Sequence, residues 1–351
     1  MTMSPFAGLR WLPLLAVAAL ALAAEACGGG AVEPPLPSSP AQPTRASGPS
    51  LEPTAPIATL GPTVGPAAAP TPTPIPSPTP TPEPTPEPTP PPEPVVEVSP
   101  EAVPQGGVFL LAVRHVEAQG ASFSFAGRRY TMLRADNALW AVVGVPVDAT
   151  PVSHSLRIVL EGSGGPLTAA LEVTAVRFPV ERLTFPPAAQ PLLDTRLFEE
   201  DAAVLARVYS GLTPDRRWRG PFLMPVEGTS EDPFGIQRFA NGIPLGQHTA
   251  LDIAADEGAP VVAANAGRVA YVGTLPIRGN AVIIDHGAGV FSGYFHLSQV
   301  GVAEGQSVAK GAVIGAVGQT GLATGPHLHW EMVVREVRVD PLAWTRQALE
   351  P

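Results

Sequence analysis

The stretch GPHLHWE at residues 325–331 places His327 and His329 on alternate positions of the chain. Successive side chains of a β-strand point to opposite faces, so both imidazoles are predicted to point the same way from one strand. The even spacing of His248 and Asp252 allows the same arrangement on a second strand. Two such strands bring four polar groups to one point. Two histidines and one carboxylate are a ligand set of catalytic zinc, since three protein ligands leave the fourth tetrahedral position open for water.

The histidines are concentrated towards the end of the chain. Seven occur among 351 residues, and five of these lie in the C-terminal third. They are His248, His286, His296, His327 and His329. Scattered surface or core histidines would not gather in this way among Gly-rich turns, so the cluster favours a metal or catalytic site. We expect His115 and His154 to be ordinary surface residues, and His286 to be structural.

Composition separates a packed part of the chain from an unpacked part. The 45 prolines are concentrated between residues 32 and 94, where almost no aromatic or long apolar residue is available for a core. Residues 28–94 are therefore predicted to be a disordered Pro-, Thr- and Glu-rich tether, a semi-rigid spacer of polyproline type. The net charge of -10 and the lack of a Lys/Arg cluster argue against a nucleic-acid partner.

Residues 1–27 have the pattern of an export signal. Arg10 precedes an apolar stretch at residues 11–24, which has the length of a signal-peptide core and is short for a membrane span. Cys27, the single cysteine, resembles the lipidated cysteine of a bacterial lipoprotein, whereas AEA at residues 24–26 also fits ordinary signal cleavage. We therefore expect an exported protein of the cell envelope, membrane-anchored through Cys27 or an uncleaved signal, or otherwise secreted. One cysteine also excludes an internal disulfide.

Residues 95–180 contain short alternating segments separated by turn residues, a pattern typical of a small immunoglobulin-like β-sandwich. The predicted strands are residues 108–113, 122–125, 139–143, 156–160 and 171–176. Residues 181–220 are predicted to be a helical connector, because apolar positions between residues 192 and 210 recur at helical spacing without Gly or Pro.

Residues 221–351 return to a strand pattern. The predicted strands are residues 260–264, 269–272, 281–285, 290–295, 313–317 and 329–334, with glycines between them as tight hairpins require. There is no βαβ alternation and no Gly-rich phosphate loop. The segment is therefore predicted to be an antiparallel β domain whose site lies in an open groove on one sheet.

Three blocks of this segment resemble the motifs of the lysostaphin-type (LytM-like) zinc metallopeptidases. They are GQHTALDI at residues 246–253, YFHLS at residues 294–298 and TGPHLHWE at residues 324–331, in the order that the family has. The resemblance implies that His248, Asp252 and His329 bind Zn²⁺, while His296 and His327 stand beside the metal as catalytic histidines. Two departures from the family pattern are Ala250, where Gly is common, and Phe295, which is expected to narrow the groove.

The resemblance further implies a zinc-dependent endopeptidase that hydrolyses peptide cross-links of bacterial peptidoglycan during cell-wall remodelling or division. A metal-activated water would be the nucleophile. His296 and His327 would be general base and oxyanion stabiliser, in either order. The alternative is a non-catalytic peptidoglycan-binding or hydrolase-activating protein of the same fold. The complete set of five site residues favours the enzyme.

Overall fold

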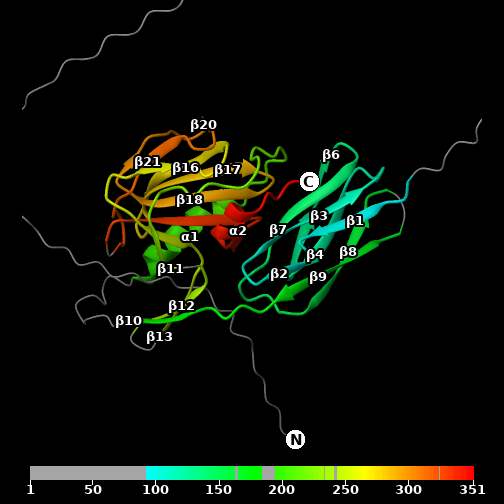
Figure 1. Cartoon of the computed structure of the whole chain (residues 1–351), viewed down its shortest axis with the longest axis horizontal. Helices are drawn as coiled ribbons and strands as arrows, with labels where there is room; N and C mark the ends of the chain where they lie inside the picture. Colours follow the sequence, from blue (N-terminus) through cyan, green and yellow to red (C-terminus); the bar gives the residue numbers. More distant parts are fainter. Residues whose placement is uncertain (1–91, 163–164, 184–193, 233, 241–242, 324) are drawn as a thin grey trace, which may run out of the picture. The chain divides into compact units, whose positions relative to one another are not determined.

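The computed structural model describes residues 92–351, apart from residues 163–164, 184–193, 233, 241–242 and 324. The expected signal at residues 1–27 and nearly all of the expected tether at residues 28–94 lie outside this part of the chain. All described residues belong to one compact unit in which strands predominate (Figure 1). None of the helices in the described residues is long and apolar enough to cross a membrane.

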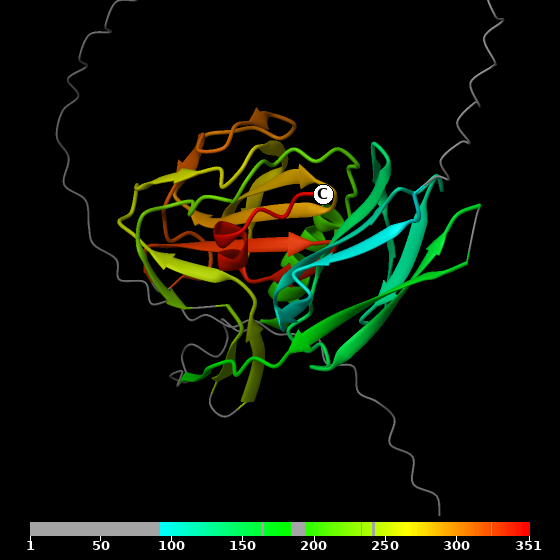
Figure 2. The same cartoon turned by 45° about the vertical axis from the view of Figure 1, so that its right-hand side comes forward.

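Residues 95–174 form nine strands. They are β1 (Val95–Ser99), β2 (Ala102–Pro104), β3 (Val108–Arg114), β4 (Ala121–Phe125), β5 (Arg128–Thr131), β6 (Leu133–Ala135), β7 (Ala138–Gly144), β8 (Ser153–Leu160) and β9 (Leu167–Thr174). One sheet has the order β1-β3-β7-β6, and the other has the order β2-β9-β8-β4-β5 (Figure 2, cyan to green). Phe109 and Leu139 of the first sheet share a core with Phe123, Ile158 and Leu171 of the second.

The two central strands of the first sheet, β3 and β7, are buried on both faces. Leu110 and Trp140, which point away from the sandwich core, join a second core with Trp218 and Trp344 of the C-terminal segment. The ring centroids of Trp140 and Trp218 lie 6.3 Å apart. Burial on both sides explains why these two strands are nearly continuous apolar runs.

The helix α1 (Thr195–Tyr209) lies within the range predicted for the connector helix. It begins after Asp194, whose carboxylate accepts a hydrogen bond of 3.0 Å from the backbone N–H of Arg196. Such a cap satisfies one of the backbone donors that the first turn leaves free. A second, short helix α2 (Pro341–Arg346) begins after Asp340 in the same way.

The largest sheet contains eight strands from the C-terminal segment. They are β11 (Thr229–Asp232), β14 (Leu251–Ala254), β16 (Gly267–Leu275), β17 (Gly279–Gly287), β18 (Val290–Leu297), β20 (Ser307–Val308), β22 (His327–Val334) and β23 (Val337–Val339). Their order is β11-β14-β22-β18-β17-β16-β20, with β23 paired to β22, and every pair is antiparallel.

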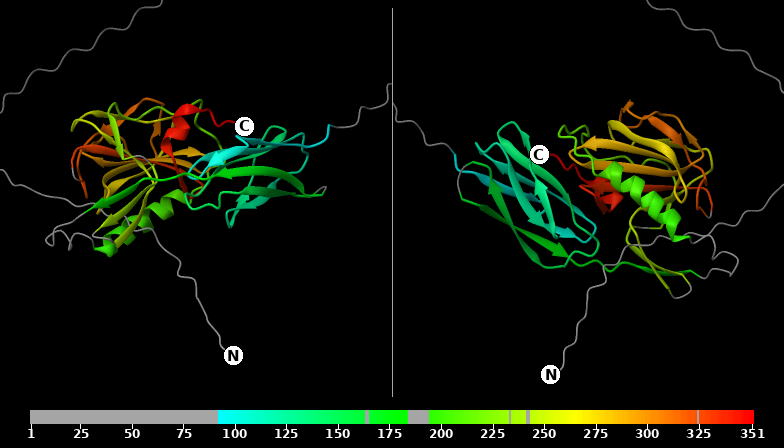
Figure 3. Two further views of the ribbon diagram at one scale, coloured as in Figure 1. Left: turned by 60° about the horizontal axis from the view of Figure 1, so that its bottom comes forward. Right: turned by 180° about the vertical axis from the view of Figure 1, so that it is seen from behind.

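The two faces of this sheet have different neighbours. On one face, Phe291, Phe295 and Val333 pack with Leu205 and Tyr209 of α1. The residues next to them along the strands point the other way and join the core that contains Trp218. Figure 3 (right) shows α1 lying across the strands. The alternation of a strand thus determines which side chains of the sheet meet α1.

Two smaller sheets complete the C-terminal segment. One is formed by β10 (Val180–Leu183), β12 (Ile236–Ala240) and β13 (Ile243–His248), with β10 parallel to β12. The other is formed by β15 (Pro260–Val262), β21 (Val313–Ala316) and β19 (Gln299–Val300).

The mainly antiparallel β architecture is confirmed, and every strand predicted from the sequence overlaps an observed strand. The pattern did not predict the short strands at residues 95–104 and 128–135, or those at residues 229–240. The immunoglobulin-like topology of the first nine strands stays a prediction, as do the boundaries of the five segments.

Candidate metal centre

The candidate ligands come from three strands. Asp252 of β14 lies directly opposite His329 of β22 in an antiparallel pair, and His248 is the last residue of β13 in the neighbouring sheet. The prediction that His248 and Asp252 share one strand is therefore wrong. A bend at residues 249–250 separates their strands, and the period of two holds only along a continuous strand. As predicted, His327 and His329 lie on the same strand and line the same hollow.

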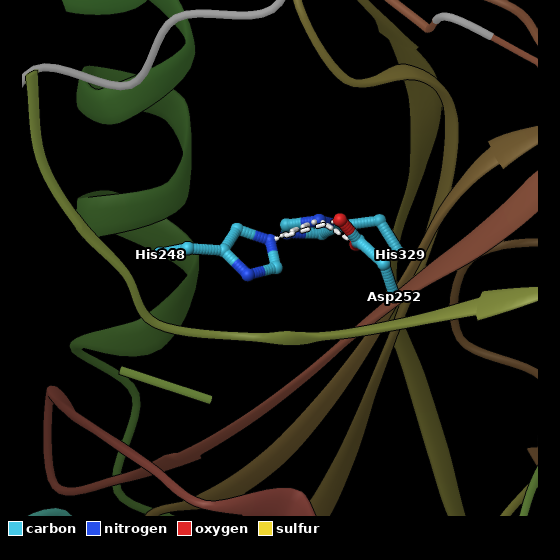
Figure 4. Close-up of side chains that lie close together, drawn as sticks. All are labelled: His248, Asp252 and His329. Atoms are coloured by element: carbon cyan, nitrogen blue, oxygen red, sulfur yellow. Dashed lines mark hydrogen bonds and ion pairs between the residues drawn. The ribbon is translucent and has the colours of Figure 1, made fainter. Parts of the chain in front are cut away.

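The three donor groups converge on one point (Figure 4). Oδ1 of Asp252 lies 2.8 Å from Nδ1 of His329, and its Oδ2 lies 3.2 Å from Nε2 of His248. Nε2 of His248 and Nδ1 of His329 are 3.3 Å apart. Around a tetrahedral ion with bonds of about 2.0–2.1 Å, two ligand atoms are roughly 3.3 Å apart. The His–Asp–His cluster therefore fits a metal site.

The electrostatics of the cluster favour a carboxylate anion beside the imidazoles. Burial opposes ionisation of Asp252, but His329 and His248 beside it hold its pKa well below the usual value. Burial lowers the pKa of His248. Burial also acts to lower the pKa of His329, but the adjacent Asp252 and Glu331 raise it overall. An ionised carboxylate is the form that binds a cation, and a metal ion would displace the proton from the His329 nitrogen that it binds.

Two further histidines lie beside the cluster. The ring centroids of His296 and His327 are 4.7 Å apart, and that of His296 is 5.8 Å from that of His329. Nδ1 of His296 lies 2.7 Å from the carbonyl oxygen of Thr320, and Nδ1 of His327 lies 2.9 Å from that of Gly325. A carbonyl oxygen only accepts, so each Nδ1 carries a proton and each Nε2 of the neutral ring has a free lone pair. Burial, with smaller effects of His329 and His327, lowers the pKa of His296 to about 3.

All five predicted site residues line one small hollow with a volume of about 30 Å³, enough for roughly one or two water molecules. Its other lining residues are Arg238, Ile277, Arg278 and Leu322. Sequence reasoning missed these four. Arg238 of β12 forms a 2.8 Å ion pair with Glu181 and lies 3.9 Å from the Asp252 carboxylate. Nothing in the local sequence signals this pairing, because the partners come from separate strands.

The other histidines lie elsewhere. His286 is fully buried, with Nδ1 2.7 Å from the carbonyl oxygen of Ala266 and Nε2 2.7 Å from the Ser292 hydroxyl. These contacts support its structural role. His115 is exposed, and Nε2 of His154 lies 2.9 Å from the carbonyl oxygen of Thr150.

The expectation for Phe295 is wrong. This side chain is fully buried in the core shared with α1 and is not part of the lining of the hollow. Its position on β18 points it towards α1, so it packs under the site and leaves the hollow unchanged.

Residues 246–341, which contain all five site residues, match the model of peptidase family M23. They form an M23 peptidase domain. The LytM-like resemblance of the sequence motifs is thereby confirmed.

Two curated proteins are similar to part of this chain. The chain is 32% identical to the peptidoglycan DD-endopeptidase ShyA of Vibrio cholerae over 142 residues, which are 40% of this chain and 31% of that protein. It is 46% identical to the DD-carboxypeptidase/endopeptidase Mpg of Neisseria meningitidis over 96 residues, which are 27% of this chain and 22% of that protein. The chain thus spans a third or less of the length of these relatives.

One solved structure is similar to this chain over a region longer than the M23 domain. It is a candidate M23 peptidase from Pseudomonas aeruginosa, which superposes with a TM-score of 0.53 at 28% identity and covers 70% of this chain and 95% of that one. The similarity therefore extends to strands that precede residue 246.

Proposed function

We propose that this protein is a zinc-dependent endopeptidase that hydrolyses peptide cross-links of bacterial peptidoglycan. The observation that carries the proposal is the convergence of His248, Asp252 and His329 within 2.8–3.3 Å of one another, with two more histidines beside them. This arrangement provides a three-ligand metal site and, next to it, groups that can move protons.

The metal ligands would be Nε2 of His248, the carboxylate of Asp252 and Nδ1 of His329. When bound there, Zn²⁺ lowers the pKa of a coordinated water to about 7 and polarises the scissile carbonyl. Two neutral imidazoles and one carboxylate carry a single negative charge, so they would leave a bound divalent ion a net positive charge. The donor set contains no sulfur, which suits zinc in a hydrolytic site.

His296 and His327 would supply the proton transfers. In hydrolysis, the water oxygen bonds to the carbonyl carbon, the C–N bond breaks, and the amine leaves with a proton. Because both Nδ1 atoms are occupied by backbone carbonyls, Nε2 of each ring is the atom that accepts or returns this proton or donates to the developing oxyanion. With its pKa lowered by burial to about 3, the His296 ring is neutral at pH 7.

The substrate class follows from the names of the relatives. ShyA and Mpg are named as enzymes that act on peptidoglycan or on D,D bonds. We propose that the substrate of this chain is also a D,D-cross-link in peptidoglycan. Such a substrate lies outside the cytoplasm, which agrees with the export signal expected at residues 1–27 and with anchoring through Cys27, both inferred from sequence.

The non-catalytic alternative is not favoured. An adaptor has no need for three buried metal donors or for two histidines with free Nε2 atoms, and all five are in place.

The test is to incubate the purified full chain with cross-linked peptidoglycan and to analyse the soluble products by mass spectrometry. We expect each cross-linked dimer to be converted to two monomers with the addition of one water, and one new amino group to appear, for each bond cut. A His327→Ala variant that still binds zinc is the matched control, and it should release far less. Equal product from the two proteins, or none from a zinc-loaded wild type, would refute the proposal.

A further inference from the structure

A buried carboxylate, Glu331, lies directly beneath the candidate ligand His329. Its side chain is 1% exposed. Oε1 accepts a hydrogen bond of 2.7 Å from Nη2 of Arg278 and lies 3.3 Å from Nε2 of His329. Oε2 accepts hydrogen bonds of 3.2 Å from Nε of Arg338 and from the hydroxyl of Tyr209. Both oxygens are therefore fully engaged.

The contact with Glu331 determines which nitrogen of His329 is available to a metal. A carboxylate only accepts, so Nε2 carries the proton that faces Glu331, and Nδ1 is the nitrogen on which a metal ion would take the place of a proton. Nδ1 is the atom that faces Asp252 and His248. A ligating histidine that donates its other N–H to a carboxylate is held in one tautomer and one ring orientation, and loss of such a partner typically costs about 10–100-fold in metal affinity.

Helix α1 contributes to this arrangement although it lies outside residues 246–341. Tyr209, in its last turn, is 4% exposed and donates its hydroxyl to Glu331. Its ring also lies below the guanidinium of Arg338, 5.9 Å from the centroid. The hydroxyl can donate only one hydrogen bond, and Glu331 receives it.

A second α1 side chain, Asp201, holds the other side of the hollow. It is fully buried and accepts a hydrogen bond of 3.0 Å from the backbone N–H of Arg278 and one of 3.3 Å from that of Ile277. Phe198, one turn earlier, packs with Ile277 and Leu322. Ile277, Arg278 and Leu322 all line the hollow.

We infer that α1 is a functional part of the metal centre, with Tyr209 and Glu331 as positioning residues for His329 and Asp201 as the residue that holds the Ile277–Arg278 wall. This inference rests on the proposed metal site and extends it to residues that the M23 match does not contain. Tyr209 acts through Glu331, and Glu331 acts through Nε2 of His329, so neither touches the substrate.

The test is zinc affinity, measured on the full chain by competition with a chromophoric chelator. Tyr209→Phe removes only the hydroxyl and should weaken zinc binding about tenfold, and Glu331→Gln should weaken it by about 10–100-fold. The matched control is Tyr271→Phe, because Tyr271 packs against the same cluster beside α1 and no hydrogen bond of its hydroxyl is found among the described residues. This control should bind zinc as the wild type does.

Co²⁺ substitution gives a second readout that a purely structural role would not change. The visible absorption of bound Co²⁺ reports ligand geometry, so its bands should shift in Tyr209→Phe and stay unchanged in Tyr271→Phe. The inference is overturned if Tyr209→Phe keeps wild-type zinc affinity and the wild-type Co²⁺ spectrum. If Glu331→Gln does not fold, because Arg278 and Arg338 lose their buried counter-ion, Tyr209→Phe decides alone.

A His329→Ala variant separates this inference from the proposed function. If His329→Ala binds zinc like the wild type, the proposed metal site itself is wrong. If His329→Ala loses zinc while Tyr209→Phe does not weaken it, the metal site stands and the role of α1 is refuted.

Discussion

Asp252 and His329 occupy opposite positions on β14 and β22, with Oδ1 of the carboxylate 2.8 Å from Nδ1 of the imidazole. Opposed residues of an antiparallel pair have Cβ atoms about 4.5–5.5 Å apart, close enough for two short side chains to share one ion. The register of this strand pair therefore sets two of the three donors, and β13 adds His248. A slip of one residue would turn His329 to the opposite face of the sheet.

Substitution of either catalytic histidine is expected to slow turnover without loss of metal. His296→Asn and His327→Ala should each reduce the rate of cross-link hydrolysis by about 100-fold or more, the usual contribution of a general acid–base group. Asn is preferred at position 296 because His296 has a φ of 60°, a left-handed conformation that Asn tolerates. The rate is measured on peptidoglycan, with zinc content by atomic absorption. Loss of zinc from His296→Asn would show that this residue supports the metal instead.

The buried His286 should make stability depend on pH. Burial lowers the pKa of its ring to about 4, against 6.5 in the unfolded chain. Between these values the unfolded chain binds more protons than the folded one, so the free energy of unfolding falls as pH decreases from 6.5 to 4. Above pH 6.5 the ring is neutral in both states, and the free energy of unfolding no longer depends on this group. The difference between the two pKa values corresponds to about 3 kcal/mol in the free energy of unfolding.

The check is urea unfolding across that pH range for the wild type and for His286→Gln. The variant should show a flatter pH dependence, because it has lost one titrating group. Identical slopes for the two proteins would contradict the role assigned to His286.

Gly287 is expected to tolerate no side chain. It has a φ of +85°, and an added Cβ would fall on the backbone oxygen of Asp215. Gly127 has a similar φ of +74° but open space around it. Each Gly→Ala change should lower the free energy of unfolding by about 1–2 kcal/mol, because alanine disfavours the left-handed backbone conformation. The clash at Gly287 should lower it by about 1–3 kcal/mol more. Thermal melts of the two variants measure the difference, and equal losses would exclude the clash.

The strands and the histidine pair of β22 could be predicted because they follow from local pattern. Alternation alone places His327 and His329 on one face, and the glycines that separate apolar runs mark the hairpins of the large sheet. The same reasoning was wrong for His248 and Asp252, because a bend of two residues moves the chain from one sheet to another. A spacing in sequence does not reveal whether a strand is continuous.

The support of the site could not be predicted from the sequence. Tyr209 and Glu331 are 122 residues apart, and Asp201 meets Arg278 across 77 residues. No periodicity links such pairs, and only the packing of α1 on the sheet brings them together. The helix was predicted from its apolar spacing, but the sequence around Asp201 and Tyr209 does not indicate which residues they bind.

The most direct test of zinc-dependent catalysis is to titrate Zn²⁺ into the metal-free full chain while measuring the rate of amino-group release from peptidoglycan. We expect the rate to rise in proportion to bound zinc and to saturate at one ion per chain. His329→Ala, which removes one of three ligands, should show neither tight binding nor release. Saturating activity in the metal-free chain, or full activity in His329→Ala, would contradict a reaction that depends on zinc at His248, Asp252 and His329.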